Sequence, residues 1–358
     1  MGSDIFKYYV LLMPLLLLSC ASDSSSQQGA ASVKSISIEG TAVTVSGVNL
    51  GIFSGEVVTW DDFEAQSLGG FIDGSTPKIG IDLTTQFSYK GNGAVWDNGN
   101  AHSGTIAAHL NWSVDENTIR AFGWGGNGPF DKLYITYWRY MTGDFGVTAL
   151  SDYNHKQFFI FGTQPDNFPQ MLPLIPSGGS KWGIYNNIGD GSVPFDERNN
   201  INTAGWSFDS TKEIFQRWEF WFVINDVNVS NGTVKAWLDG ELGIENLAYN
   251  SRRVDGLWED FRLGHQAIGF SDTAKAWFDD LYIATTQQRI EVCNSKEWSN
   301  RGQCDIQVVM PEDWTSTKIT FQIRGSVLTT TEEMYLYLID NDGVVINQSG
   351  LALQEFIQ

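Results

Sequence analysis

The segment 217–286 constrains the fold most strongly, because it reads as short alternating strands separated by turns rich in Asp, Asn and Gly. Its first strand, WEFWFVIN at 218–225, alternates between an apolar face and a mixed face. The apolar face carries Phe220, Phe222 and Ile224, and the mixed face carries Glu219, Trp221 and Val223. We expect the first face to pack in a sheet-on-sheet core, and the second to present a carboxylate and a large ring outside that core.

Composition points to the same fold class. The chain has 358 residues, with 37 Gly, 14 Trp, 12 Tyr and 22 Phe, and long segments of helical periodicity are hard to find. Gly suits tight turns and aromatic residues suit sheets, so the composition predicts an all-β fold. The formal net charge of −20 repels nucleic acid and anionic lipid head groups, so no nucleic-acid partner is expected.

The N-terminus carries a targeting signal. Residues 1–19 hold an apolar run too short to span a bilayer, and they lead to the sequence LLSC, which ends at Cys20. This ending resembles the lipobox of bacterial lipoproteins. The resemblance implies cleavage after residue 19, lipidation of Cys20 and a flexible tether at 20–33. It also implies a lipid-anchored protein of the bacterial cell envelope, either periplasmic or on the cell surface.

Two further cysteines, Cys293 and Cys304, have ten residues between them across a polar turn. They could close a loop of hairpin size. A disulfide there agrees with an oxidising compartment, and two free or buried thiols are the alternative.

The two ends of the chain share a pattern of short strands. The sequence at 32–51, SVKSISIEGTAVTVSGVNLG, resembles the opening of an IPT/TIG immunoglobulin-like domain, and 289–358 again holds short alternating strands. We expect an immunoglobulin-like β-sandwich formed by 34–58 and 289–358, with 59–288 inserted into it. The alternative is an N-terminal hairpin followed by an independent C-terminal domain.

The inserted segment resembles the concanavalin A-like jelly rolls in its W-x-x-x-F-x-x-N strand, its AWLDG strand and its closing FDDLYI. That group includes glucanases, lectins, and alginate or glucuronan lyases. The predicted fold is therefore all-β, a concanavalin A-like jelly-roll sandwich plus a small immunoglobulin-like β-sandwich. The resemblance allows one structural calcium ion, although no ligand set in the sequence requires it, and no other cofactor or metal site is predicted.

The sequence bears on two kinds of polysaccharide chemistry. The E-x-D-x-x-E strand of retaining glucanases is absent, and alternation places Asp279 and Asp280 on opposite faces, so retaining hydrolysis is disfavoured. The strand KWGIYNN at 181–187 resembles the K-x-G-x-Y-N-Q strand of alginate lyases, while that family's R-x-E-x-R and Q-[IV]-H strands have no counterpart here. The resemblance implies that Lys181 neutralises a uronate carboxylate and that Tyr185 transfers a proton.

Alternation alone supplies the remaining site residues. His109 and His155 are the candidate partners of Tyr185 in proton transfer. Candidate ligand-binding residues, which combine rings that stack on sugars with groups that bond hydroxyls, are Trp138, Tyr134, Tyr140, Asn111, Lys156, Glu219 and Trp221.

The preferred function is binding of polysaccharide on the concave face of the jelly roll. A lyase that cleaves uronate glycans by β-elimination is the first alternative, and a structural or adhesive surface protein is the second, so the sequence leaves open whether the chain is an enzyme. A lyase requires a basic cleft, and a binder of neutral glycan requires an aromatic cleft without clustered cations. A structural protein requires no cleft and could show a large apolar patch.

Overall fold

The computed structural model describes twelve stretches of the chain: residues 30–83, 85–89, 93–112, 118–142, 154–162, 170–175, 183–187, 213–253, 255–268, 274–301, 303–324 and 333–355. Cys20 and Lys181 lie outside them. Ala31–Gln358 forms one compact unit, distinct from Met1–Ala30. Within the described stretches, no helix has the length and apolarity needed to cross a membrane.

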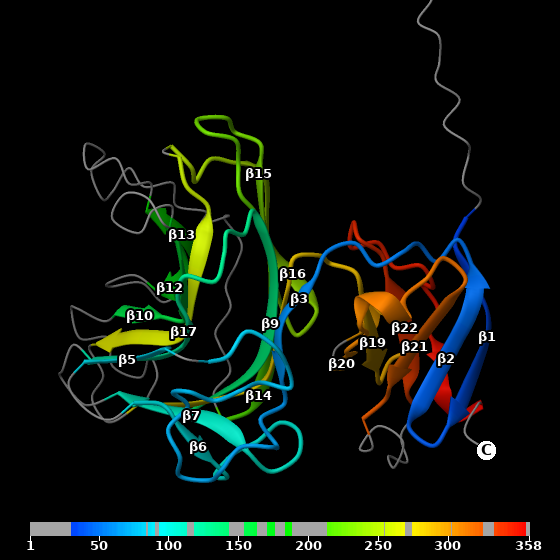
Figure 1. Cartoon of the computed structure of the whole chain (residues 1–358), viewed down its shortest axis with the longest axis horizontal. Helices are drawn as coiled ribbons and strands as arrows, with labels where there is room; N and C mark the ends of the chain where they lie inside the picture. The colour runs from blue at the N-terminus through cyan, green and yellow to red at the C-terminus, as the bar shows by residue number, and fades with distance from the viewer. Residues whose placement is uncertain are drawn as a thin grey trace, which may run out of the picture. The chain divides into compact units, whose positions relative to one another are not determined.

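A large sandwich of two antiparallel sheets forms the middle of the chain (Figure 1). The first sheet places the expected strand of 218–225 near its centre, observed as β14 with the bounds Phe215–Val223. In order, the described strands of this first sheet are β16 (Glu241–Tyr249), β15 (Gly232–Leu238), β14, β9 (Lys132–Met141), β18 (Ala274–Ala284), β3 (Val57–Asp61) and β4 (Ile79–Gly80), with β7 (Ala107–Trp112) beside β18 and β6 (Val95–Asp97) beside β7.

The second layer of the large sandwich is the facing sheet, which Figure 1 shows opposite the first. Its described strands are β10 (Asn154–Lys156), β12 (Gln170–Ile175), β11 (Phe158–Gly162), β17 (Trp258–Ile268), β8 (Thr118–Trp124) and β5 (Thr85–Tyr89), with β13 (Gly183–Asn187) beside β12.

The core of the large sandwich lies between these sheets and is rich in aromatic rings. Phe220 and Phe222 are fully buried there, and Ile224 is 9% exposed, which agrees with the apolar face predicted for β14. The ring of Phe158, from the facing sheet, lies 4.9 Å from that of Phe220 in an edge-to-face arrangement. Each buried Phe side chain contributes about 2–3 kcal/mol through removal of apolar surface from water, so this layer of rings holds the sheets together.

A small sandwich joins the two ends of the chain. One of its sheets consists of β1 (Ser32–Glu39), β2 (Ala42–Val48) and β21 (Lys318–Gln322); the other consists of β20 (Cys304–Gln307), β19 (Arg289–Cys293), β22 (Tyr335–Ile339) and β23 (Leu351–Ala352). Val45 pairs with Ile319 across β2 and β21, and both are buried in one core with Ile290. The N-terminal strands thus share a sheet and a core with strands that follow the large sandwich.

The fold class is all-β, as predicted: α-helices are missing from the described stretches, where only short 3₁₀ turns interrupt the strands and loops. These turns are η2 (Trp298–Asn300), η3 (Pro311–Asp313) and η4 (Leu353–Glu355). Cys293 and Cys304 pair across β19 and β20 and form a disulfide with a Cα–Cα distance of 4.1 Å.

Candidate functional site

Four predicted ligand-binding side chains lie on the face of the first sheet that points away from the large core. They are Tyr134, Trp138, Glu219 and Trp221, and each is at most 8% exposed. The small sandwich covers this face, where Tyr134 and Trp221 cluster with Ile306 of β20. The expectation that these residues face a glycan is therefore wrong, because strand alternation does not reveal what packs against each face.

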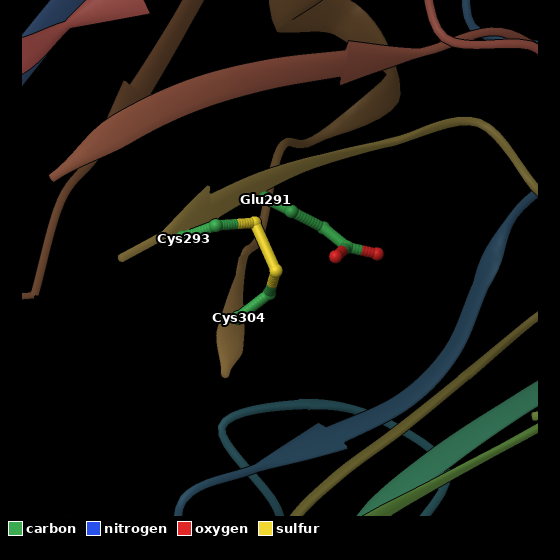
Figure 2. A group of neighbouring side chains, drawn as sticks. All are labelled: Glu291, Cys293 and Cys304. Carbon is green, nitrogen blue, oxygen red and sulfur yellow. A yellow bond between two sulfur atoms is a disulfide. The ribbon is translucent and has the colours of Figure 1, made fainter. Parts of the chain in front are cut away.

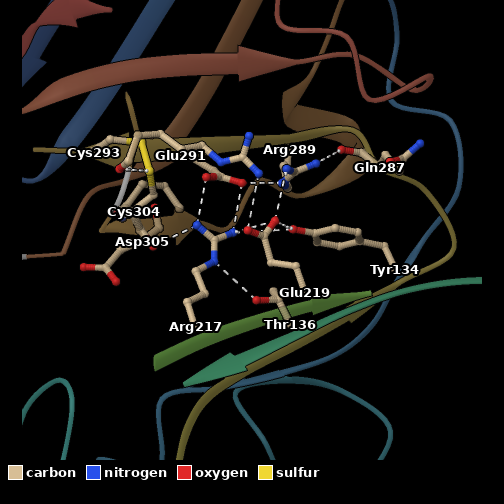
Figure 3. A network of polar contacts seen from close by, with 12 residues as sticks. Tyr134, Thr136, Arg217, Glu219, Gln287, Arg289, Glu291, Cys293, Cys304 and Asp305 are labelled. Atoms are coloured by element: carbon tan, nitrogen blue, oxygen red, sulfur yellow. Dashed lines mark hydrogen bonds and ion pairs between the residues drawn. A yellow bond between two sulfur atoms is a disulfide. The ribbon is translucent and has the colours of Figure 1, made fainter. Parts of the chain in front are cut away.

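A buried ion network occupies the same contact between the sandwiches (Figure 3). Arg217 Nη1 and Nη2 donate to the two carboxylate oxygens of Glu291 at 2.8 and 2.9 Å. Tyr134 Oη donates to Glu219 Oε2 at 2.8 Å, and Arg289 Nη2 lies 3.6 Å from the same oxygen. Bidentate pairing of a guanidinium with a carboxylate fixes both partners in orientation. These groups therefore hold the two sandwiches together.

The charges in this network are stable near neutral pH. Burial raises the pKa of Glu291, but the charges of Arg217 and Arg289 lower it by more, so its pKa lies well below the ordinary value. Burial also raises the pKa of Glu219, whereas the charge of Arg217 lowers it. The net effect is a pKa below the ordinary value. A general acid needs a pKa near the operating pH, so Glu219 is not suited to proton transfer.

A bulge in β18 changes the positions of the two adjacent carboxylates. Asp280 has a φ of 51°, in the left-handed region, and the register between β18 and β9 shifts after Asp279. Asp279 Oδ2 accepts from the backbone N–H groups of His102 and Ser103 at 2.8 and 3.1 Å. Asp280 Oδ1 accepts from the Ser103 hydroxyl at 3.0 Å. The expectation that alternation separates these carboxylates is wrong, because the bulge turns both toward one loop.

This carboxylate pair is buried, and burial governs its protonation. Burial first, and then the charge of Asp280, raise the pKa of Asp279 to about 9. Burial therefore favours the neutral form of Asp279. Its contacts are to backbone N–H groups of a loop, so its position is that of a structural anchor between β18 and that loop.

One described group with metal-binding residue types is Glu291, Cys293 and Cys304. The two sulfurs are joined to each other in a disulfide, which Figure 2 shows. Metal coordination by cysteine requires a thiolate, and neither sulfur can supply one while the disulfide is intact. The group is therefore not a metal site.

A second described group is His102, Asp280 and Asp305. His102 Nε2 lies 3.1 Å from Asp305 Oδ1, and the His102 ring stacks on Trp138 at 3.6 Å. Arg324 Nη1 donates to Asp280 Oδ1 at 2.7 Å, so a cation already occupies this carboxylate. Calcium takes six to eight oxygen ligands, which this group does not offer. The residues fit an ion-pair cluster and do not fit calcium.

His109, Asn111 and Tyr140 lie on the outer side of the first sheet. The His109 ring stacks on Trp277 at 4.5 Å, burial lowers its pKa, and Tyr140 contacts the edge of the same tryptophan. Asn111 is exposed. The strand of Tyr185 belongs to the facing sheet. The structure therefore does not bring His109 together with Tyr185, and the predicted proton-transfer pairing of these two residues is not supported.

His155 and Lys156 are adjacent but point in opposite directions. His155 is fully buried, contacts the guanidinium of Arg139 and lies edge-to-face with Trp112 at 5.6 Å. Lys156 Nζ instead lies 5.6 Å from the ring centroid of Phe159, on the outer side of the facing sheet. His155 is thus placed in the large core and not as a base for a ligand on that outer side.

Tyr185 lies in β13, where its backbone pairs with Leu172 of β12. At this position the structure describes the backbone only, and Lys181 falls outside the described stretches. Because β12 also pairs with β11, the strand of Tyr185 and the strand of Phe159 belong to one sheet.

The outer side of β10, β11 and β17 carries a group of residues that we name the aromatic–cation surface: Lys156, Phe159, Phe161, Asp260 and Arg262. The rings of Phe159 and Phe161 are parallel, with centroids 4.8 Å apart and an interplanar angle of 6°. The Arg262 guanidinium lies 4.2 Å from the Phe161 ring centroid and donates to Asp260 at 3.2 Å. Side chains of Asp260 and Arg262 are 23% and 21% exposed.

Sequence reasoning identified only Lys156 of this surface. The missed signal is the alternation within FFIFG at 158–162. Phe158 and Ile160 point into the large core, and Phe159 and Phe161 therefore point away from it. A run of five buried apolar residues hides this alternation, because both faces of the strand carry large apolar side chains.

Comparisons with known proteins find distant structural likenesses. No protein-family model matches the chain, and no curated protein sequence is significantly similar to it. Among solved structures, an endo-β-1,4-glucuronan lyase from the fungus Trichoderma reesei has a TM-score of 0.44 and 14% identity, covering 62% of this chain and 96% of that one. The alginate lyase Aly36B, in a mutant complex with alginate trisaccharide, has a TM-score of 0.47 and 9% identity, covering 64% and 98%.

A third structure, the cellulose-induced protein Cip1, has a TM-score of 0.41 and 19% identity, covering 63% of this chain and 97% of that one. All three TM-scores are below 0.5. The function proposed below therefore rests on the residues of this chain.

Proposed function

We propose that this chain is a lipid-anchored protein of the bacterial cell envelope that binds polysaccharide on the outer side of its facing sheet. The LLSC sequence ending at Cys20 supports the anchor. The aromatic–cation surface supports the binding site. This site differs from the predicted one on β9 and β14, because the small sandwich covers that face.

The observation that carries the proposal is the partly exposed Arg262–Asp260 pair beside the ring of Phe161, with Lys156 beside the ring of Phe159. Arg262 lies 4.2 Å from one ring and Lys156 lies 5.6 Å from the other. The rings of Phe159 and Phe161 are each 7% exposed and support the two cations, whose charged N–H groups can bond hydroxyl or carboxylate oxygens of a glycan. The chain as a whole carries a charge of −20, whereas this surface holds two cations and one carboxylate among its described residues.

Burial affects the protonation of both cations. It lowers the pKa of Lys156, and it lowers that of Arg262 against the opposing effect of Asp260. A bound uronate carboxylate would favour the charged form of this partly buried lysine, because an opposite charge favours ionisation. The surface therefore suits a glycan that contains uronate better than a purely neutral one.

A second candidate function is polysaccharide lysis by β-elimination. The observation that favours it is the sheet topology: β13, which carries Tyr185, is separated from β11 only by β12. In this reaction a base removes the proton alpha to the uronate carboxylate, and the C4–O4 bond breaks with its electrons leaving on the glycosidic oxygen, which is then protonated. Lys156 or Arg262 would neutralise the carboxylate, and Tyr185 would transfer a proton.

The test is affinity electrophoresis of the full chain in mild detergent, through gels that contain neutral or uronate polysaccharides. Retardation in uronate gels is expected, and the substitutions Lys156→Ala and Arg262→Ala should each weaken it by roughly tenfold, as loss of a charge-assisted hydrogen bond predicts. Lys235→Ala is the matched control, because Lys235 is a partly exposed cation on the other sheet, paired with Glu245 at 2.9 Å.

Ultraviolet absorbance, followed on the same samples, separates binding from lysis. A rise reports the unsaturated uronate, and its loss in Tyr185→Phe with retardation intact would support the lyase. Retardation without a rise would support a binding protein. Absence of both on neutral and uronate polymers would contradict the proposal and favour the structural or adhesive alternative.

A further inference from the structure

The two cations of the aromatic–cation surface have different surroundings. Arg262 Nη2 donates to Asp260 Oδ2 at 3.2 Å, and both side chains are partly exposed. Lys156 belongs to β10, and burial is the cause that lowers the pKa of its ammonium. The rings beside these cations, those of Phe159 and Phe161, have centroids 4.8 Å apart. The two settings are therefore neighbours on one surface.

A second contact fixes the position of Asp260. Its Oδ1 accepts from the backbone N–H of Gly126 at 2.8 Å, so each carboxylate oxygen has one donor within the protein. An ionised carboxylate offers about four lone-pair sites, so each oxygen can accept once more from a ligand. Gly125 and Gly126 are exposed, and a Cβ at Gly125 would lie 3.3 Å from Asp260 Oδ1. The glycines thus leave space beside this carboxylate.

A partly exposed pair of arginine and aspartate has the chemistry of a hydroxyl site. The Arg262 guanidinium only donates and the Asp260 carboxylate only accepts, whereas a sugar hydroxyl does both. A uronate at this position would bring a second carboxylate next to Asp260, and like charges placed together in a binding site lower the affinity. The pair therefore suits a neutral sugar better than an acidic one.

Lys156 has the chemistry of a carboxylate site. Burial takes its ammonium partly out of water, which disfavours the charged form. A ligand carboxylate favours the charged form, and a neutral hydroxyl supplies no such charge. Of the two cations, Lys156 is therefore the better partner for a uronate.

We infer that the aromatic–cation surface binds a glycan in which a uronate is bonded to a neutral sugar. The uronate carboxylate lies at Lys156, and hydroxyls of the neutral sugar lie at Arg262 and Asp260. Asp260 is then the residue that selects against a second, adjacent uronate. The inference rests on the proposed function, since it names the class of glycan for the same surface.

The test is affinity electrophoresis of the full chain in mild detergent, over a range of polymer concentrations that gives a Kd for each polymer. Hyaluronan and gellan are the mixed probes, because each combines glucuronate with neutral sugars. Alginate and polygalacturonate contain only uronate, and galactomannan is the neutral probe. At least one mixed polymer should bind more tightly than the other three probes. Simple attraction between cations and anions would give the opposite order, because an all-uronate polymer has the higher charge density.

The substitution Asp260→Asn tests the selecting residue. The new side chain keeps an oxygen that can accept from Gly126 but loses the negative charge. The ratio of the Kd for alginate to the Kd for the mixed polymer should therefore fall by about tenfold. Asp255→Asn is the matched control, because Asp255 also pairs with an arginine, Arg252 at 2.8 Å, and lies between β16 and β17, outside the surface. This control should leave the ratio unchanged, and far-ultraviolet circular dichroism establishes that both variants are folded.

The outcomes separate this inference from the proposed function. Tightest binding of an all-uronate polymer or of galactomannan would overturn the inference. A ratio unchanged in Asp260→Asn, or an equal fall in Asp255→Asn, would do the same. In these cases, retardation by uronate polymers would leave the proposed function standing. Absence of retardation by every polymer that contains uronate would contradict the proposed function, and the inference with it.

Discussion

Removal of Arg217 should reveal how strongly the two sandwiches depend on each other. Arg217 is 2% exposed, makes two hydrogen bonds to Glu291 and donates to the carbonyl of Cys304 at 2.9 Å. Breaking a buried ion pair by removing one partner costs about 3–5 kcal/mol, because the other charge stays buried. For a unit of roughly 330 residues, an unfolding entropy of about 2.1 cal/mol/K per residue gives about 0.7 kcal/mol/K. A loss of about 4 kcal/mol then lowers the Tm by about 6 °C.

Differential scanning calorimetry at pH 7 measures this change in Arg217→Met, in Glu291→Leu and in the double variant. The double variant should lose less stability than the sum of the singles, with a coupling free energy above about 1.5 kcal/mol. Lys235→Met is the control, since its ion pair with Glu245 is partly exposed and such pairs contribute about 0–1 kcal/mol. If each single variant lost less than about 1 kcal/mol, or the losses were additive, the network would not hold the sandwiches together.

Three further predictions concern stability. Burial raises the pKa of Asp61 from 3.8 to about 6, so the native state binds more protons than the unfolded state between these values, and stability should fall as the pH rises from about 4 to 6. In Asp61→Asn the free energy of unfolding should lose this dependence on pH, a difference of at most about 3 kcal/mol across the interval. Urea titrations at several pH values measure it, and parallel curves of unfolding free energy against pH for the two proteins would refute it. Replacement of Cys293 and Cys304 by Ser should cost about 3 kcal/mol, as expected for closure of a loop with a separation of 11 residues; equal urea midpoints for variant and parent would contradict it. Phe220→Ala should cost about 3–5 kcal/mol through the cavity it leaves beside Phe158, whereas Phe71→Ala, at a side chain 56% exposed, should change the Tm little; similar losses in both would argue against the assigned core.

The sequence alone determined the all-β class and the core-facing side of β14. Alternation is a local property, because successive side chains of a strand point to opposite faces wherever the strand lies. Phe220 and Phe222 could therefore be assigned to a core, and the all-β class followed from many such segments. The closing FDDLYI sequence likewise lies in an observed strand, β18, with the bounds Ala274–Ala284.

The tertiary structure alone decided what covers each strand's other face. Tyr134 and Trp221 are residue types that suit a sugar-binding surface, yet Ile306 of the small sandwich packs on them. The bulge at Asp280 brings together two carboxylates that regular alternation would separate. Arg217 and Glu291 are 74 positions apart in the chain. Such long-range contacts decide whether a polar side chain pairs within the protein or faces a ligand, and no local sequence pattern encodes them.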